Sequence, residues 1–441
     1  MHPSTSIVSK KVAQTHGFSD LIPEILIDVK RKELIFLASL CGDSARLPAL
    51  PSFQDCLTEK MRLRALIKRR SIPYNDDFES SLDLSRPKSW AGMEFNFNYQ
   101  RLGFLNSDLT SHTSLYGENQ SHSSQLLWTS SCQQAISCLL MSASQKGIKI
   151  VCPWGAYWET ISFIENFLNC PLLLEKPRQS WILYLDSSVW PVGRQLDFDV
   201  KLCEAIVFDT TCFARKSSRI QEVIEFAKMA NVPLFLIRSH QKLDCLGMEF
   251  GRLGSVLFLD FSFEKTSKEK SKSLLYALSE IGRWFALFPN YTQVYPFMFN
   301  EEFTSLNSQW IERVKRNQIL INGALEDLSW TKPIVFDHGL YFYLRFKMDL
   351  SEQEFEDIKT SLSRRLIILK IPSQFVASYP WDFVALTGFK QNHSFFPEKR
   401  RSHTLRVSVG DIGEKLALDF AYHLKIWAEK FDHLIYDRFE N

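Results

Sequence analysis

Residues 231–255 have the sequence NVPLFLIRSHQKLDCLGMEFGRLGS, which decides the fold prediction. The run 232–237 is apolar, with Pro233 only near its start, and this pattern is typical of a parallel strand covered on both faces. Ser239 and Lys242 follow in the loop at the carboxyl end of that strand. Ligands of open α/β sheets bind at this edge, and an amine in a site of low dielectric can lose its proton and act as a nucleophile. We therefore expect the chemistry of this protein at this loop.

The composition favours a chain with a large core and a small-molecule ligand. Hydrophobic residues make up 45% of the 441 residues, and 52 basic residues against 50 acidic ones favour neither nucleic acid nor an anionic membrane as a partner. The nine cysteines form no CxxC pair, so neither a disulfide framework nor a zinc site is indicated. No apolar run is typical of a signal peptide or long enough to span a membrane. We expect a soluble cytoplasmic protein with reduced thiols and no metal.

The middle of the chain alternates between helical and strand-like patterns. Residues 219–230 have apolar side chains at helical spacing behind the candidate caps Ser217 and Ser218. Strands that alternate with helices predict a mainly parallel, doubly wound sheet, and therefore an α/β fold. The other elements predicted for this sheet are helices at 131–141 and 158–167 and strands at 148–152, 180–185, 205–208, 232–237 and 256–261.

Outside this region, the sequence indicates an N-terminal arm at 1–95 and a small C-terminal α+β domain at 301–441, with the large domain at 96–300 between them. The arm contains the basic stretch 59–70, EKMRLRALIKRR, which we interpret as a solvated helix face, the alternative being a nucleic-acid contact. The elements predicted for the small domain are strands at 340–346, 366–371 and 405–409 and helices at 351–363 and from 410 to about 430.

Two further positions are candidates for the same sheet edge. Asp209 closes the apolar run 205–208 and lies 33 residues before Lys242, so adjacent strands would bring the two side chains together. The sequence SSCQQA at 130–135 has the small residues of a turn that opens a helix, where backbone N–H groups bind anions. A turn cap is the alternative function for Asp209, and a plain helix cap is the alternative for Ser131.

Taken together, these positions resemble the pyridoxal-phosphate (PLP) enzymes of fold type I, the aspartate aminotransferase superfamily, over roughly residues 95–430. The sequence Ser-His-Gln-Lys at 239–242 is similar to the family's Ser-x-x-Lys, which makes Lys242 the Schiff-base lysine and the catalytic residue. The resemblance implies that Asp209 pairs with the pyridine nitrogen and that an aromatic residue, Tyr157 or else Trp158, stacks on the ring. The contacts implied for the cofactor phosphate are Ser131, Cys132, Gln133, Ser239 and Arg252.

The resemblance also implies a substrate and a partner. Arg406 in HTLRVSVG (403–410) resembles the arginine that binds the α-carboxylate of an amino-acid substrate. The sequence Tyr-Gln-Arg at 99–101 resembles a Tyr-x-Arg that reaches the phosphate of a neighbouring subunit, which implies a homodimer.

Two departures from the family pattern concern the reaction type more than the cofactor. Trp190 stands where the family has an asparagine, and Cys212 stands where many aminotransferases have a tyrosine. The sequence therefore predicts a PLP enzyme that acts on an α-amino acid, most readily an aminotransferase. A lyase for β/γ-elimination or replacement and a catalytically degenerate homologue with a binding role are the alternatives.

Overall fold

The protein is described from a computed structural model of the chain. The described residues are 24–41, 46–71, 88–90, 93–95, 115–116, 124–152, 156–170, 178–189, 200–247, 253–262, 265–284, 300–325, 331–346, 350–369, 371–374, 382–392 and 401–436.

The large sheet has six strands in the order β3-β8-β7-β6-β5-β4. Strand β8 is antiparallel to both of its neighbours, and the other pairs are parallel. Every residue of β5, β8 and nearly all of β7 is buried, as expected for strands covered on both faces. The strands are β3 (Ser124–Thr129), β4 (Lys149–Val151), β5 (Trp181–Leu185), β6 (Cys203–Asp209), β7 (Leu234–Ser239) and β8 (Gly254–Leu259).

Helices cover this sheet on both faces. From β3 the chain crosses by α3 (Cys132–Gln145) to the far edge at β4, and it then returns strand by strand through β5 and β6 to β7. The crossover through α3 and the crossover through α5 (Ser218–Met229) run in opposite directions along the sheet. Right-handed crossovers in opposite directions lie on opposite faces, so α3 and α5 are on different sides of the sheet. Helix α6 (Lys265–Trp284) packs on α3. Ser217 caps α5, as predicted. A short helix α4 (Trp158–Ser162) continues into a π-helical turn, η5 (Phe163–Phe167), and Ser187–Val189 forms a 3₁₀ turn, η6. The α/β class and the mainly parallel sheet are confirmed.

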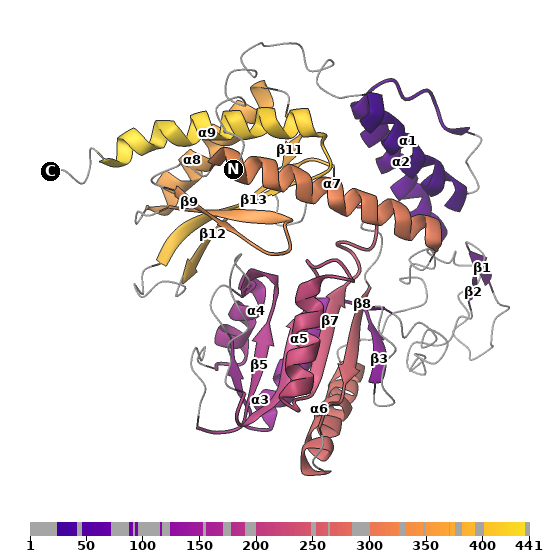
Figure 1. Cartoon of the computed structure of the whole chain (residues 1–441), viewed down its shortest axis with the longest axis vertical. Helices are drawn as coiled ribbons and strands as arrows, with labels where there is room; N and C mark the ends of the chain where they lie inside the picture. The colour runs from indigo at the N-terminus through magenta and orange to yellow at the C-terminus, as the bar shows by residue number, and fades with distance from the viewer. Residues whose placement is uncertain are drawn as a thin grey trace, which may run out of the picture.

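A second, five-stranded sheet belongs to the C-terminal part and lies above the first in Figure 1. Three helices accompany it, of which α7 (Glu301–Leu325) and α9 (Glu414–Tyr436) pack on each other. Its strand order is β11 (Ser373–Gln374), β12 (Val384–Asn392), β13 (Arg401–Val409), β10 (Tyr341–Phe346) and β9 (Thr331–Val335).

The strand predicted at 366–371 is wrong. Helix α8 (Glu352–Ile368) includes Leu366, because the buried positions Phe355, Ile358, Leu362 and Leu366 continue the helical spacing to the end of the segment. The apolar run that suggested a strand is the last turn of this helix, where Ile367 and Ile368 are exposed.

The N-terminal arm contains α1 (Glu24–Leu40) and α2 (Phe53–Ser71), which pack on each other beside α7 (Figure 1), and a short hairpin of β1 (Lys88–Trp90) and β2 (Met93–Phe95). The arm is not simply a solvated surface. Lys60, in the basic stretch predicted to face solvent, is 2% exposed. The solvated-face interpretation is therefore wrong for this lysine, since its charge is neutralised inside the protein.

Five buried charges and the partly buried Arg313 join α1, α2 and α7 to two loops of the C-terminal sheet. Lys30 Nζ lies 2.8 Å from Asp411 Oδ2 and Lys60 Nζ lies 2.7 Å from Asp382 Oδ2, and Lys30 also binds Asp382. Burial alone would raise the pKa of Asp382, but the ammonium groups of Lys30 and Lys60 hold that pKa at about 2. The network consists of three cations and three anions, namely Lys30, Lys60, Arg313, Glu33, Asp382 and Asp411.

Candidate cofactor site

A cavity of about 430 Å³ lies at the carboxyl edge of the large sheet, where the predicted site residues meet. This volume is within the usual range for small-molecule sites. Arg252, Trp190 and the Tyr-Gln-Arg at 99–101 lie outside the described residues. The predicted residues that line the cavity are Ser131, Cys132, Gln133, Tyr157, Asp209, Ser239, Lys242 and Arg406.

Two neighbouring strands place Asp209 and Lys242 on the same wall. Asp209 is the last residue of β6 and is in register with Ile237 of β7. Lys242 lies in the turn that starts after Ser239, the last residue of β7. Asp209 and Lys242 are 33 residues apart, and α5 lies between them in the chain. Because parallel strands end at the same edge of the sheet, both residues lie at this edge.

The carboxylate of Asp209 is half-buried at the end of β6, among polar groups. Its Oδ1 accepts a hydrogen bond from the backbone N–H of Thr211 at 2.9 Å, so the turn cap that was the alternative for this residue is present. Burial raises the pKa of Asp209, although hydrogen bonds from Thr211 and from the Cys132 thiol act in the opposite direction. A cationic ligand group at this carboxylate would stabilise its ionised form.

Helix α3 points its amino end at the cavity. Ser131 is the N-cap and accepts a hydrogen bond from the N–H of Gln134 at 3.0 Å, so the helix cap predicted as the alternative is also present. The other N–H groups of the first helical turn have no partner within the helix, which makes this end suited to an anion. Burial, and then the nearby Asp209, raise the pKa of the Cys132 thiol well above its usual range, so Cys132 is a neutral wall residue.

Gly254, at the start of β8, allows the close approach of this strand to the helix end. A Cβ atom here would lie 2.6 Å from Thr129 Oγ1 and 2.7 Å from Cys132 N, which is too close for any side chain. The backbone of β8 therefore packs directly under the turn that carries Ser131 and Cys132.

We expect Gly254→Ala to push the amino end of α3 away from β8. The free energy of unfolding should fall by about 1–3 kcal/mol, as overpacking usually costs, and anion binding at this helix end should weaken. Denaturant unfolding and a titration with inorganic phosphate would measure both effects. Gly323→Ala in α7 is the matched control, because nothing lies within 4 Å of its added methyl group, and helix propensity should raise stability by roughly 0.5–1 kcal/mol. Equal effects of both substitutions would contradict this account of Gly254.

Tyr157 is an aromatic residue of the cavity wall that follows β4 and precedes α4. Its backbone N–H donates to Asp186 Oδ2 at 2.6 Å, so the carboxylate that follows β5 fixes its position. Burial and the neighbouring Glu159 raise the pKa of the Tyr157 hydroxyl above its usual value, which keeps the phenol neutral. Trp158, the second choice from the sequence, is 42% exposed.

The C-terminal sheet supplies the opposite wall through Arg406 and Tyr341. Arg406 is a buried residue of β13 whose Nη2 donates to Thr387 Oγ1 on β12 at 3.1 Å. Its guanidinium lies 5.7 Å from the centre of the Tyr341 ring, and the Tyr341 hydroxyl is 3.1 Å from Ser187 Oγ of the large domain. The positive charge of Arg406 is therefore held against the cavity that contains Lys242.

The sequence prediction missed several lining residues, among them Glu159, Asp186, Thr211 and Tyr341. Thr211 joins the ends of β6 and β7, because its hydroxyl accepts from the N–H of Ser239 at 3.0 Å while its own N–H donates to Asp209. Its position two residues after Asp209, in an Asx-turn, was the available signal. Tyr341 had no signal, since only the packing of the two sheets brings it to the site.

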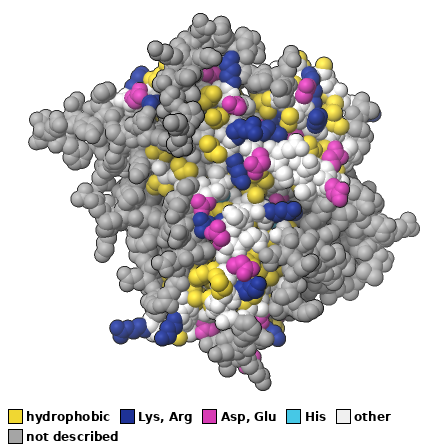
Figure 2. Space-filling model, viewed as in Figure 1, with side chains coloured by type: hydrophobic (Ala, Val, Ile, Leu, Met, Phe, Trp, Pro, Cys, Tyr) yellow, Lys and Arg dark blue, Asp and Glu magenta, His cyan; other side chains and the backbone are white. Residues whose placement is uncertain are grey.

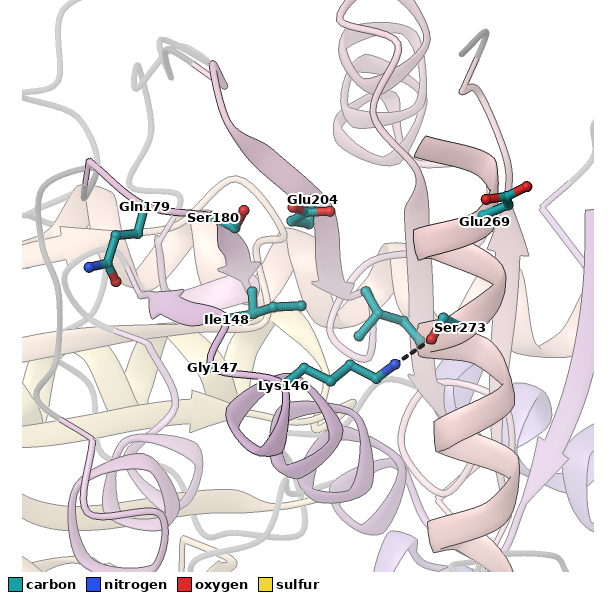
Figure 3. A pocket seen from close by; sticks show the side chains of 9 residues that line it. Lys146, Gly147, Ile148, Gln179, Ser180, Glu204, Glu269 and Ser273 are labelled. Atoms are coloured by element: carbon teal, nitrogen blue, oxygen red, sulfur yellow. Dashed lines mark hydrogen bonds between the residues drawn. The ribbon is translucent and has the colours of Figure 1, made fainter. Parts of the chain in front are cut away.

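A second hollow, of about 730 Å³, lies at the opposite edge of the sheet (Figure 3). Its lining residues Lys146, Ser180 and Glu204 lie close to the amino ends of β4, β5 and β6. Figure 3 shows Lys146 directed at Ser273 of α6, and Glu204 and Glu269 on separate elements. Ligands of open α/β sheets bind at the carboxyl edge, so the smaller cavity is the candidate site.

Fold and cavity together define an α/β chain with a cavity at the carboxyl edge of a mainly parallel sheet, and Tyr341 and Arg406 of a second sheet also line this cavity. No family model matches the chain, and no curated protein is found similar to it. Solved structures do show similarity. That of metB from Corynebacterium glutamicum has 12% identity and a TM-score of 0.48, covering 81% of this chain and 97% of the other.

Two further solved structures have comparable values. LysN, an α-aminoadipate aminotransferase from Thermus thermophilus complexed with N-(5'-phosphopyridoxyl)-L-leucine, has 14% identity and a TM-score of 0.45, over 70% of this chain and 78% of the other. An archaeal O-phosphoseryl-tRNA(Sec) selenium transferase has 12% identity and a TM-score of 0.43, over 93% and 99%. The function proposed below rests on the geometry of the site.

Proposed function

We propose that the protein is a PLP-dependent enzyme that acts on an α-amino acid and carries the cofactor on Lys242. The observation that supports this proposal is the single cavity whose wall contains Lys242, Asp209, the amino end of α3 and Arg406, contributed by four separate segments of the chain. These groups provide an amine, a carboxylate, an anion site and a guanidinium, which correspond to the functional groups of PLP and of an amino-acid substrate.

The residues present fit the cofactor. The N–H groups of Cys132 and Gln133, together with the Ser239 hydroxyl, would hold the phosphate at the helix end. Asp209 would hold the protonated pyridine nitrogen, whose charge would offset the burial that now raises the pKa of this carboxyl group. Tyr157 would limit the tilt of the ring. The Nζ atom of Lys242 would replace the oxygen of the cofactor aldehyde, which leaves as water.

Arg406 and Lys242 perform the steps that act on the substrate. Arg406 would bind the α-carboxylate and thereby orient the bonds of Cα in the cavity. The amine of Lys242 would remove the Cα proton and return it. PLP, when bound, supplies the electron sink for the electron pair that is left on Cα.

We propose transamination as the reaction, with elimination or replacement of a β or γ substituent as the alternative. The helix between Asp209 and Lys242 and the Gly-Arg-Leu-Gly sequence at 251–254 resemble the aminotransferases, whereas the segment with Arg406 and the Tyr-x-Arg at 99–101 are compatible with the lyases. A screen of amino acids that measures keto acid, ammonia and glutamate separately distinguishes the two reactions. Ammonia without an acceptor keto acid would identify a lyase.

The purified protein is expected to take up PLP and to show a visible absorption band that borohydride bleaches. Peptide mapping after reduction should recover the cofactor on Lys242. A colourless protein that takes up no added PLP would contradict the proposal and would leave the degenerate homologue with a binding role.

Figure 2 shows basic and acidic side chains mixed over the described part of the face in view, so this face offers no single-sign surface for a polyanion.

A further inference from the structure

The turns that carry Asp209 and Lys242 are joined by one buried arginine. Arg238, on β7, has no exposed surface, and its Nη1 donates to the carbonyl oxygens of Thr210 and Phe213, each at 2.8 Å. These carbonyls belong to the turn that directly follows Asp209. The other side of the same guanidinium binds Asp244, with Nε 2.7 Å from Oδ2 and Nη2 3.0 Å from Oδ1. The planar fork of an arginine is suited to hold both partners at once.

Asp244 in turn fixes both ends of the segment that contains Lys242. Its Oδ2 lies 2.7 Å from Nδ1 of His240, so residues 240 and 244 are bridged on either side of residue 242. The Nε2 atom of His240 lies 2.8 Å from Ser255 Oγ, and the backbone N–H of His240 donates to the carbonyl of Leu253. The turn is therefore also tied to the start of β8, the strand that packs under the amino end of α3.

Ser255, His240 and Asp244 are hydrogen-bonded in the sequence of a Ser-His-Asp catalytic triad, but here the three side chains have a structural role. Ser255 and His240 are fully buried, so no substrate reaches the serine. Burial lowers the pKa of His240 to about 4, although Asp244 opposes this effect, and the ring is neutral at pH 7. A neutral ring donates from Nδ1 to Asp244 and accepts at Nε2 from the Ser255 hydroxyl, which satisfies both nitrogens.

We propose that Arg238, Asp244 and His240 are positioning residues that set the place of the Lys242 amine relative to the Asp209 carboxylate. The expected effect on cofactor attachment rests on the proposed function. The joining of the two turns by Arg238 is independent of that function. Attachment requires one amine to meet one aldehyde while Asp209 holds the far side of the same ring. A displacement of about 1 Å between the two turns would cost roughly 10²-fold in rate.

The test compares two variants with a matched control. Asp244→Asn removes the charge and keeps the shape, whereas Arg238→Lys keeps the charge and loses the planar fork that reaches two partners. Arg219→Lys is the control, because Arg219 also pairs with an aspartate, Asp337, but at a partly exposed position away from the cavity. If Asp244→Asn fails to fold because it leaves Arg238 uncompensated, Arg238→Lys still gives the result.

Amide hydrogen exchange of the protein without PLP is the first measurement. We expect faster exchange in residues 210–213 and 240–245 together in both variants, with α9 unchanged and the control like the wild type. Faster exchange in only one of the two turns would overturn the inference.

The rate at which added PLP becomes attached to Lys242, followed by its visible band, is the second measurement. Both variants should slow attachment by roughly 10²-fold. If PLP became attached at the wild-type rate in variants whose two turns exchange faster, the cluster would have a purely structural role. That result would overturn the inference. A wild-type protein that forms no band would instead refute the proposed function, and hydrogen exchange alone would then decide whether Arg238 joins the turns.

Discussion

Replacing Lys242 by alanine should abolish covalent attachment of PLP and reduce the turnover of any amino-acid substrate by at least roughly 10²–10⁴-fold, the usual contribution of a general acid-base residue. The physical reason is that this side chain has two proposed functions, as the amine that attaches the cofactor and as the base that moves the Cα proton. Reduction with borohydride followed by peptide mapping measures the first function. The loss of the α-deuteron from a labelled amino acid measures the second.

Lys228→Ala is the control for this experiment. Lys228 is an exposed residue in the last turn of α5 that pairs only with the exposed Glu225 on the described surface, so its loss should change neither measurement. The free energy of unfolding of the Lys242→Ala protein should equal that of the wild type to within about 0.5 kcal/mol, since Lys242 lies in a turn at a cavity wall. Full activity in a protein without Lys242 would refute the proposed function.

Replacing Asp382 by asparagine should lower the free energy of unfolding by about 3–5 kcal/mol, because it leaves the buried ammonium groups of Lys30 and Lys60 without one of their three anions. Both oxygens of Asp382 are used, one by each lysine, and neither lysine is more than 3% exposed. Denaturant unfolding measures the loss. Asp28→Asn is the matched control, since its pair with Arg31 is exposed and should contribute roughly 0–1 kcal/mol.

The effect of Asp382→Asn should also depend on pH. The pKa of Asp382 is about 2 in the folded protein and about 3.8 when unperturbed. A carboxyl group with a depressed pKa contributes stability that is fully present above its unfolded pKa and is lost as the pH falls through its folded pKa. The difference between wild type and variant should therefore be constant above about pH 5 and shrink below about pH 4. A difference that stays constant down to about pH 3 would contradict the assigned pairing.

The sequence predicted the large sheet well because its strands are short, apolar and separated by amphipathic helices, a pattern produced by local chain properties. It failed at residues 366–371, where an apolar helix end and a buried strand have the same composition and differ only in length and spacing. It also failed at Lys60, because a lysine on a basic helix gives no sign of the aspartate, 322 residues away, that neutralises it.

The sequence by itself determined which residues follow the strands, and therefore that Asp209, Ser239 and Lys242 lie at one sheet edge with the helix that starts after Ser131. This follows from topology, since parallel strands joined by right-handed crossovers end on the same side. Only the tertiary structure decided that Tyr341 and Arg406 close the cavity and that Arg238 joins the two turns behind it. Those contacts depend on packing between distant segments and on hydrogen bonds to backbone carbonyls, neither of which leaves a local pattern in the sequence.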